Sequence, residues 1–376
     1  MAAPQTTIFE TMSGLCREFG AINLGQGFPE LPEPGEVIAA AQRALAERSN
    51  QYPPMRGLGE LRGAVAGYYA ADGVSAEEVI ITSGATEALA SAILALVAPG
   101  DEVICIQPLY DAYLPLIERA GCVPVLVSLT PPHWGLDLAA LGAAITAKTR
   151  LIILNTPNNP TGTVLDRATL EGIGALAQRH DLVVLSDEVW EATLLDGSAP
   201  VSVLSVPSLR ERAVKVGSAG KIFSLTGWKI GWAVGAPHLA ERIAARHQFI
   251  TFTTATPLQW AVAEGLALGA EWMAAHRARY GASKARLVGG LEAAGFAVLP
   301  AAGTWFVSVD LAASGLPADD VAVAQRLVRE AGVGSIPVSA FYARDAEKGY
   351  LRLCHAKQDA TLDAAVERLQ AFRRGL

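Results

Sequence analysis

The sequence predicts an α/β protein with a mostly parallel, seven-stranded sheet flanked by helices, followed by a smaller α+β domain. Seven short runs rich in Val and Ile lie at residues 79–82, 102–106, 123–129, 150–154, 182–186, 213–217 and 229–234. Most of these runs do not alternate polar with apolar residues, which is typical of strands covered on both faces. Helical patterns at 86–97, 111–120 and 167–179 separate most of the runs. This alternation indicates parallel strands joined by right-handed crossovers.

The pattern changes at the end of the sheet and again after Pro237. Runs 213–217 and 229–234 are joined by a short connection without a full helix, so we expect them to form an antiparallel pair. A long helical stretch follows at 258–291. The smaller α+β domain is then predicted by strand-like pieces at 296–299, 305–310 and 350–353 and by helical patterns at 318–331 and 359–372. We place the large domain at 37–275 and the small C-terminal domain at 276–376.

Composition limits the class of protein. The chain has 376 residues, of which 51% are apolar and 18% charged, as in a compact enzyme and unlike a disordered chain. A net charge of −7 without a basic run argues against binding to nucleic acid or to a membrane surface. The four cysteines form no Cys-x-x-Cys pair, and the chain has neither a signal-peptide pattern nor an apolar run of bilayer length. We therefore expect a cytoplasmic protein without disulfides or a metal site.

Three polar residues follow apolar runs of the predicted sheet. Asn159 lies in the string N-T-P-N-N-P-T-G at 155–162, Asp187 ends the run at 182–186, and Lys221 ends the turn S-A-G-K. An aspartate at the carboxyl end of a buried parallel strand faces the crevice where α/β sheets bind ligands. A lysine in a turn of small residues is poorly solvated, and desolvation beside a second cation such as Lys229 lowers its pKa. Its neutral amine could then form a Schiff base.

An asparagine, an aspartate and a lysine in this order form the constellation that holds pyridoxal phosphate. With the string T-G-W-K-I-G-W at 226–232, they make the chain resemble the class I aminotransferases of fold type I over nearly its whole length. The resemblance is greatest to the branch of glutamine–kynurenine transaminases and bacterial methionine aminotransferases. It implies that the large domain binds pyridoxal phosphate and that an N-terminal arm, residues 1–36, packs with the small domain. It also implies a homodimer with shared active sites.

The resemblance implies a role for each contact with the cofactor. Lys221 would form the Schiff base, and Asp187 would pair with the ring nitrogen and keep it protonated. The phosphate would lie at the helix start in S-G-A-T-E, 83–87, where backbone N–H groups are free at the positive end of a helix. Tyr110 would stack on the ring, and Asn159 would donate to the ring oxygen. The full predicted set is Tyr52 from the neighbouring subunit, Ser83, Gly84, Ala85, Tyr110, Asn159, Asp187, Trp190, Ser218, Lys221 and Lys229.

One position departs from the family pattern. Where the family reads D-E-V-Y, this chain reads D-E-V-W, so Trp190 replaces a tyrosine whose hydroxyl donates to the ring oxygen. The indole N–H is also a donor, but the ring is bulkier and the donor is differently placed. Either Trp190 substitutes for the tyrosine or Asn159 acts alone.

Arg352 is the predicted anchor for the α-carboxylate of the substrate. It alternates with apolar neighbours in Y-L-R-L, 350–353, and an inward arginine needs an anion, which its planar fork can bind through two hydrogen bonds. By resemblance, Gly27 belongs to an arm segment that closes on the substrate. The chain shows no second arginine at a distal-carboxylate position, which favours apolar, aromatic or sulfur-containing amino acids over aspartate. The other predicted substrate contacts are Phe28, Asn159, Trp305, Phe341 and, across the dimer, Phe252.

The resemblance thus predicts an aminotransferase that moves the amino group of a methionine-, glutamine-, kynurenine- or phenylalanine-type L-amino acid to a 2-oxo acid by a ping-pong mechanism. A carbon–sulfur β-lyase acting on cysteine S-conjugates shares every residue above and stays open as an alternative. A nicotinamide oxidoreductase is disfavoured because no G-x-G-x-x-G follows the first strand. A non-catalytic regulator that senses the cofactor is disfavoured because no basic N-terminal region supplies a DNA-binding module.

Overall fold

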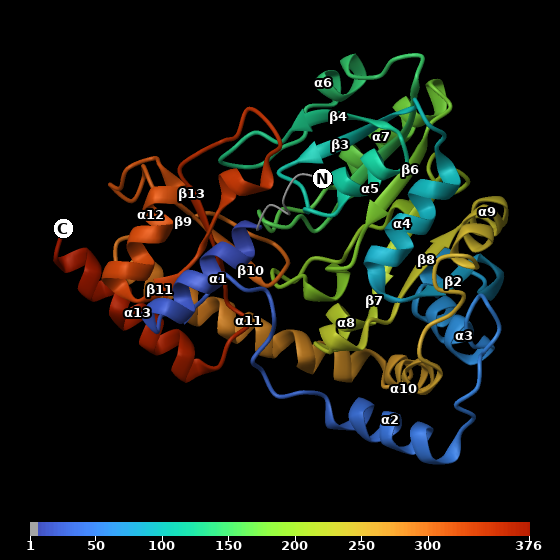
Figure 1. Cartoon of the computed structure of the whole chain (residues 1–376), viewed down its shortest axis with the longest axis horizontal. Coiled ribbons are helices and arrows are strands. Elements are labelled where there is room, and N and C mark those ends of the chain that lie inside the picture. The colour runs from blue at the N-terminus through green and yellow to red at the C-terminus, as the bar shows by residue number, and fades with distance from the viewer. Residues whose placement is uncertain (1–6) are drawn as a thin grey trace.

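A seven-stranded sheet forms the centre of the larger part of the molecule in the computed structural model, which describes residues 7–376 (Figure 1). The strand order is β2-β8-β7-β6-β5-β3-β4. Strand β8 runs antiparallel to its neighbours β7 and β2, and the remaining pairs are parallel. The mostly parallel sheet and its antiparallel pair are as predicted. The strands are β2 (Val79–Thr82), β3 (Glu102–Gln107), β4 (Val123–Ser128), β5 (Thr149–Asn155), β6 (Val183–Asp187), β7 (Ala213–Ser218) and β8 (Gly231–Gly235).

Helices cover both faces of this sheet. Helices α4 (Gly84–Leu96), α5 (Tyr113–Arg119) and α9 (Pro237–His247) pack on one face. Helices α3 (Gly59–Tyr68), α6 (Leu138–Ala143), α7 (Arg167–Arg179) and α10 (Thr256–Leu266) pack on the other, and α2 (Gly35–Glu47) packs on α10. Successive residues of β5 lie on opposite faces of the sheet: Leu151 belongs to the core formed with the first set of helices, and Ile152 belongs to the core formed with the second set. Burial on both sides explains why the strands read as continuous apolar runs.

The smaller part of the molecule is built on a four-stranded antiparallel sheet. Its order is β12-β13-β10-β9, formed by β9 (Ala297–Val298), β10 (Phe306–Asp310), β12 (Ile336–Pro337) and β13 (Tyr350–Cys354). Helices α12 (Asp320–Arg326) and α13 (Asp359–Arg374) pack beside it. Arg352 lies at the centre of β13, the five-residue strand between β12 and β10.

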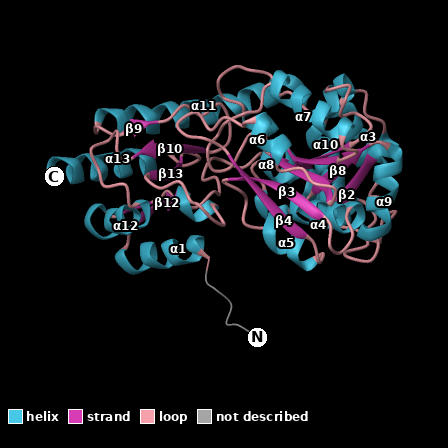
Figure 2. Ribbon diagram, turned by 90° about the horizontal axis from the view of Figure 1, so that it is seen from above, coloured by secondary structure: helices cyan, strands magenta, loops and turns pink. Residues whose placement is uncertain are grey.

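The expected helical stretch at 258–291 is two helices rather than one. Helix α10 ends at Leu266, and α11 (Gly269–Ala293) begins at a glycine with a φ of +83°. A right-handed helix cannot continue through a residue with positive φ, so the chain turns there. Helix α11 then runs without interruption across the position proposed as the domain boundary, and it connects the two parts of the molecule (Figure 2).

The N-terminal arm lies on the smaller part. Strand β1 (Ile22–Asn23) pairs in parallel with β11 (Val333–Gly334), and α1 (Ile8–Phe19), blue in Figure 1, lies beside the orange and red elements. Met12 and Cys16 of α1 join the apolar core of the small sheet. Thr7 starts the helix by accepting a hydrogen bond from the backbone N–H of Glu10. In the part of the chain described here, no helix has the length and apolar character needed to cross a membrane.

Candidate active site

A cavity of about 210 Å³ lies at the edge of the sheet where β2, β3, β5, β6 and β7 end. These strands run in one direction, so their carboxyl ends meet at that edge. Most of the predicted cofactor contacts come together on the wall of this single cavity, although the sequence spreads them over more than a third of the chain. Those on the wall are Gly84, Ala85, Tyr110, Asn159, Asp187, Trp190, Ser218, Lys221 and Lys229.

Lys221 reaches the cavity from α8 (Ala219–Ile222), a single helical turn that directly follows β7. Its Nζ lies 4.5 Å from the centroid of the Trp190 ring and 4.7 Å from that of Trp305. Burial lowers the pKa of the Lys221 amine to about 8, although the Asp187 carboxylate opposes the shift by favouring the ammonium ion. A large fraction of the amine is therefore neutral in weakly alkaline solution, as a base or a nucleophile requires.

Asp187 ends β6 with its side chain buried against the same cavity. The Tyr113 hydroxyl donates to Oδ2 at 2.8 Å, and the backbone N–H of Val189 donates to Oδ1 at 3.3 Å. Burial raises the pKa of Asp187 to about 6, and the hydrogen bond from Tyr113 works against that rise. At neutral pH the carboxylate is therefore mostly anionic, in the same cavity as Lys221.

The start of α4 forms one end of the cavity. Gly84 has a φ of +78°, and a Cβ at this position would lie 3.1 Å from Cε of Lys229. A Cβ on Gly231 would lie 2.6 Å from the carbonyl carbon of Gly84 and 2.7 Å from the nitrogen of Ala85. The two glycines thus allow the helix start, β8 and Lys229 to come together. The result is a positive, backbone-lined cradle of the kind that binds phosphate.

A series of amide and guanidinium contacts joins the loop after β5 to the smaller sheet. Asn155 Nδ2 donates to the backbone carbonyl of Asp187 at 3.1 Å, and Asn155 Oδ1 accepts from the backbone N–H of Asn159 at 2.8 Å. Arg352 Nη1 donates to Asn159 Oδ1 at 2.9 Å. Because that oxygen is occupied, the side-chain amide of Asn159 can offer its Nδ2 as a donor to a ligand.

Arg352 is almost fully buried on β13. Its Nη2 donates to the carbonyl of Gly25 at 2.6 Å, and its Nε has no hydrogen-bond partner within residues 7–376. The ring centroids of Phe306 and Phe341 lie 3.9 Å and 5.0 Å from its Cζ. Burial lowers the pKa of the guanidinium to about 9, which still leaves it charged at neutral pH. A buried cation with neutral partners and an unpaired Nε is suited to receive an anion.

Two predicted contacts lie behind the cavity wall. The backbone N–H of Ser83 donates to Glu87 Oε2 at 2.6 Å, and the Ser83 side chain does not cap α4. Trp305 is fully buried, and its ring packs edge-on against Trp190 with the centroids 4.9 Å apart. Trp305, which we expect beside the substrate side chain, contacts Lys221 and Trp190.

The arm residues and the residues expected to act across a dimer lie at the surface. Gly27 packs closely on Phe306, since a Cβ there would lie 2.6 Å from the ring. Phe28 is half exposed. Tyr52 is 83% exposed and Phe252 is 40% exposed, and their rings form an edge-on pair with centroids 5.7 Å apart. On a single chain these two side chains therefore make an exposed aromatic pair outside the cavity.

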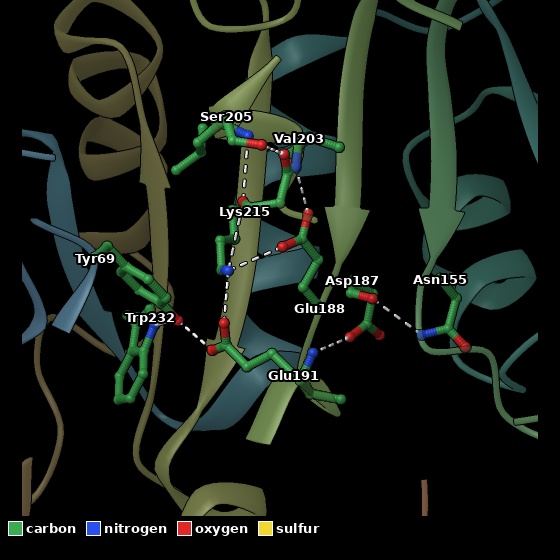
Figure 3. A network of polar contacts seen from close by, with 12 residues as sticks. Tyr69, Asn155, Asp187, Glu188, Glu191, Val203, Ser205, Lys215 and Trp232 are labelled. Atoms are coloured by element: carbon green, nitrogen blue, oxygen red, sulfur yellow. Dashed lines mark hydrogen bonds and ion pairs between the residues drawn. The ribbon is translucent and has the colours of Figure 1, made fainter. Parts of the chain in front are cut away.

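A buried ion cluster of Lys215, Glu188 and Glu191 holds the turn that follows Asp187 (Figure 3). Lys215 points to the opposite face of β7 from its apolar neighbours, and its Nζ lies 2.9 Å from Glu188 Oε2 and 2.6 Å from Glu191 Oε2. All three side chains are buried. The turn thus supplies Asp187, Val189 and Trp190 to the cavity wall, while Glu188 and Glu191 are anchored away from the cavity.

Neutral donors complete this cluster. The Tyr69 hydroxyl donates to Glu191, and Trp232 Nε1 donates to the Tyr69 oxygen at 3.0 Å. The backbone N–H of Val203 donates to Glu188 Oε1 at 3.0 Å. A buried ion cluster needs such donors, because Coulomb attraction alone does not offset the cost of removing the charges from water.

Some residues of the site were missed by sequence reasoning. Asn155 lies in the string N-T-P-N-N-P-T-G with Asn159, and Thr86 lies in S-G-A-T-E with Ala85, so their positions in these motifs could have indicated that they belong to the site. Tyr113 had none, because its partner Asp187 lies 74 positions away. The missed residues are Thr86, Leu89, Asn155, Val189, Gly220, Thr226 and Ile230 on the wall, with Tyr113 and Phe306 behind it.

The architecture is that of a fold type I transferase. The structure of the Escherichia coli methionine aminotransferase matches with a TM-score of 0.95 and 40% identity, over 98% of each chain. A Thermus thermophilus aspartate aminotransferase variant matches with a TM-score of 0.90 and 32% identity, over 100% of this chain and 98% of its own.

The chain belongs to the family of class I and II aminotransferases, whose family model matches residues 20–369. The Escherichia coli methionine aminotransferase is 40% identical over 97% of this chain and 95% of its own. A probable N-succinyldiaminopimelate aminotransferase of Mycobacterium tuberculosis is 40% identical over 98% and 96%. Human kynurenine–oxoglutarate transaminase 1 is 33% identical over 96% and 94%. The protein is therefore an aminotransferase, an enzyme that uses amino acid and 2-oxo acid substrates.

Proposed function

We propose that this aminotransferase depends on pyridoxal phosphate and acts on apolar, aromatic or sulfur-containing L-amino acids. The observation that carries the proposal is the convergence of Lys221, Asp187, Asn159 and Lys229 on one cavity. They supply a buried amine, a buried carboxylate, an amide donor and a cation beside a helix start. These are the groups that pyridoxal phosphate requires of a protein.

The cavity suits each functional group of that cofactor. Ser218, Lys229 and the first N–H groups of α4 would hold the phosphate in the cradle left open by two glycines. Tyr110 would stack on the ring, and Asp187 would pair with the ring nitrogen. When bound, pyridoxal phosphate supplies a conjugated ring that accepts the charge left when the substrate Cα loses its proton.

We assign the donor to the ring oxygen to Asn159 rather than to Trp190. The face of the Trp190 ring lies 4.5 Å from the Lys221 amine, so this side chain serves as a wall for the lysine. Asn159 keeps its Nδ2 for a ligand because Arg352 occupies its Oδ1. The indole that replaces the usual tyrosine would therefore stabilise charge on Lys221 instead of donating a hydrogen bond.

Lys221 would hold the cofactor covalently and act as the base for the Cα proton of the substrate. A pKa near 8 lets the buried amine accept a proton at neutral to weakly alkaline pH. Once protonated, the ammonium would be stabilised by the Asp187 carboxylate and by the faces of Trp190 and Trp305.

The substrate class follows from what surrounds Arg352. Its guanidinium would bind the α-carboxylate, and the rings of Phe306 and Phe341 make the space beside it apolar. The cations on the cavity wall formed by the described residues are Lys221 and Lys229, and both already have a role. A distal carboxylate would therefore find no further cation on this wall. This favours substrates of the methionine or kynurenine type, the amino acids named for two of the relatives.

We further propose a homodimer in the cytoplasm. The exposed pair of Tyr52 and Phe252 lies outside the cavity of its own chain, as expected for side chains that complete the site of a partner subunit. All four cysteines are free and buried, which suits a reducing compartment.

An absorbance spectrum of the purified protein with pyridoxal phosphate, followed during additions of single amino acids, tests this proposal. We expect a visible cofactor band that methionine, phenylalanine and kynurenine shift and that a 2-oxo acid restores. Lys221→Ala should keep the fold and lose both the band and turnover. A matched panel of aspartate and N-succinyldiaminopimelate should react poorly, and preference for either would contradict the substrate class. Release of pyruvate and ammonia from a cysteine S-conjugate, without any transamination, would indicate a β-lyase.

A further inference from the structure

Tyr113 makes a direct contact with Asp187 but lies behind the cavity wall. Its hydroxyl donates to Asp187 Oδ2 at 2.8 Å, and its side chain is 1% exposed. It begins α5, just after the loop that carries Tyr110, and the two rings pack edge-on with centroids 5.7 Å apart. The segment that carries Tyr110, the residue proposed to stack on the cofactor ring, thus also carries Tyr113, which donates to the Asp187 carboxylate.

The direction of this hydrogen bond is determined by burial. Burial, with the Asp187 charge added, raises the pKa of the Tyr113 phenol well above its ordinary value, so the phenol stays protonated and donates. The other carboxylate oxygen, Oδ1, receives the backbone N–H of Val189. Each oxygen of Asp187 therefore has one internal donor, and its remaining lone pairs are free for a cation in the cavity.

The charge on Asp187 results from opposing effects. Burial raises its pKa to about 6, and the nearby Glu188 acts in the same direction. The Tyr113 hydrogen bond is the largest effect that lowers it, followed by the Val189 N–H and the charge of Lys221. Two further groups face the phenol itself, Tyr110 and Cys105, and neither carries a charge at neutral pH. With a pKa this close to neutrality, loss of one strong hydrogen bond would change the charge state.

We infer that Tyr113 is a positioning residue that holds Asp187 anionic and correctly oriented for a protonated ring nitrogen of the cofactor. The inference rests on the proposed function. Without the phenol hydroxyl, the carboxylate would bind a proton more tightly. The proton shared with the ring nitrogen would then move from nitrogen to the Asp187 oxygen, with no other bond formed or broken. A neutral ring withdraws less charge from the substrate Cα, so proton removal by Lys221 would slow.

The test compares Tyr113→Phe with the wild-type holoenzyme, using pyridoxal phosphate labelled with nitrogen-15 in the ring. Nitrogen NMR should show a protonated ring in the wild type and a shift toward the neutral pyridine in the variant. We expect kcat to fall roughly 10- to 100-fold, the effect of one hydrogen bond to a charged group. KM should change little, because Arg352 is untouched. Tyr69→Phe is the matched control, since it removes a buried hydroxyl that donates to Glu191 on the other face of the sheet. It should lose stability without changing the ring nitrogen signal.

A double variant separates action through Asp187 from a general packing effect. In an Asp187→Asn background, adding Tyr113→Phe should produce no further change in the ring nitrogen signal or in kcat. A protonated wild-type ring with an unchanged Tyr113→Phe spectrum would overturn this inference alone. A wild-type protein that binds no pyridoxal phosphate would overturn the proposed function as well.

Discussion

At the scale of single residues, the charge of each proposed catalytic and binding group depends on burial. The same desolvation lowers the pKa of Lys221 and Arg352 and raises that of Asp187. For the lysine this yields a neutral amine, which is the useful form. For Arg352 and Asp187 the charged form is the useful one, so the loss of hydration on burial is a cost in free energy that bonding partners must offset. The hydrogen-bond partners that the described residues give these two side chains are all neutral. In our proposal, the ring nitrogen of the cofactor offsets this cost for Asp187, and the substrate α-carboxylate offsets it for Arg352.

The rate of cofactor uptake should depend on the protonation of Lys221. Only the neutral amine attacks a carbonyl, and the pKa is lowered to about 8, so the neutral fraction rises through weakly alkaline pH. We expect the rate at which cofactor-free protein takes up pyridoxal phosphate to increase with pH and to level off above about pH 8. Stopped-flow absorbance would measure it. A rate that keeps rising toward pH 10 would show that the lysine keeps its ordinary pKa.

Arg352→Ala should raise KM for every amino acid substrate by a similar factor. All of them share the α-carboxylate, and loss of a desolvated, hydrogen-bonded ion pair costs about 2–4 kcal/mol, or roughly 30- to 1000-fold. Steady-state kinetics over the substrate panel would measure the factor. Arg286→Ala is a suitable control, because Arg286 pairs with Asp359 and Asp363 at the surface. A change in KM confined to one side-chain type would assign Arg352 to the side-chain pocket.

At the scale of elements, the unit formed by β6, the turn after it and β7 combines chemistry with stability. One face of the turn supplies Asp187 and Trp190 to the cavity, and the other face is tied to Lys215. The glycines play a similar role at the helix start, because Gly231 lets β8 approach the backbone of Gly84. In both places, contacts on the side of the backbone that faces away from the cavity hold the residues that line the cavity in position.

Removal of the buried cation should destabilise the protein strongly. Lys215→Met would leave Glu188 and Glu191 buried without a cation, and breaking such a cluster typically costs about 3–5 kcal/mol of unfolding free energy. Urea unfolding followed by circular dichroism would measure the loss. The triple variant Lys215→Met, Glu188→Gln, Glu191→Gln should recover most of it, because no uncompensated charge remains. If the triple variant is as unstable as the single one, the cluster acts through its shape and not its charge.

At the scale of the whole molecule, the site is assembled from both parts of the chain and, in our proposal, from two chains. Arg352 of the smaller part reaches Asn159 of the larger part, and the arm supplies Gly25 to the same guanidinium. Helix α11 connects the two parts as one uninterrupted element. The exposed Tyr52 and Phe252 lie where a second chain could use them.

Hybrid dimers should test the sharing of sites. Lys221→Ala and Tyr52→Ala chains should each be inactive or nearly so. After mixing and random exchange, half of the dimers are hybrids with one complete site of two, so we expect about a quarter of wild-type activity. Activity assays on the mixture, with light scattering to confirm the assembly, would measure it. An active monomer, or a mixture no more active than its parents, would contradict shared sites.

Local pattern determined the fold class and placed Asn159, Asp187 and Lys221 at the ends of strands, and the family resemblance supplied the other predicted residues that lie on the cavity wall. Buried strands read as apolar runs, and Asn159, Asp187 and Lys221 each follow such a run or its turn. Since parallel strands end at one edge, their neighbouring residues meet without any knowledge of packing. The break between α10 and α11 lies at Gly269, and its residue type alone does not distinguish it from Gly281, Gly289 and Gly290, which lie inside α11 without breaking it.

The contacts that tune those residues were decided only by tertiary structure. Lys215 lies within a run that predicts an apolar strand, and only the structure shows that it is the cation of a buried cluster. The resemblance places Trp305 beside the substrate, and only the structure shows that it packs against Lys221 and Trp190. Tyr113 reaches Asp187 from another helix, and no local pattern pairs them. The physical reason is that periodicity reports which face of an element is buried. Which side chains then meet depends on register and on how helices pack across the sheet, and that information exists only once the elements are assembled.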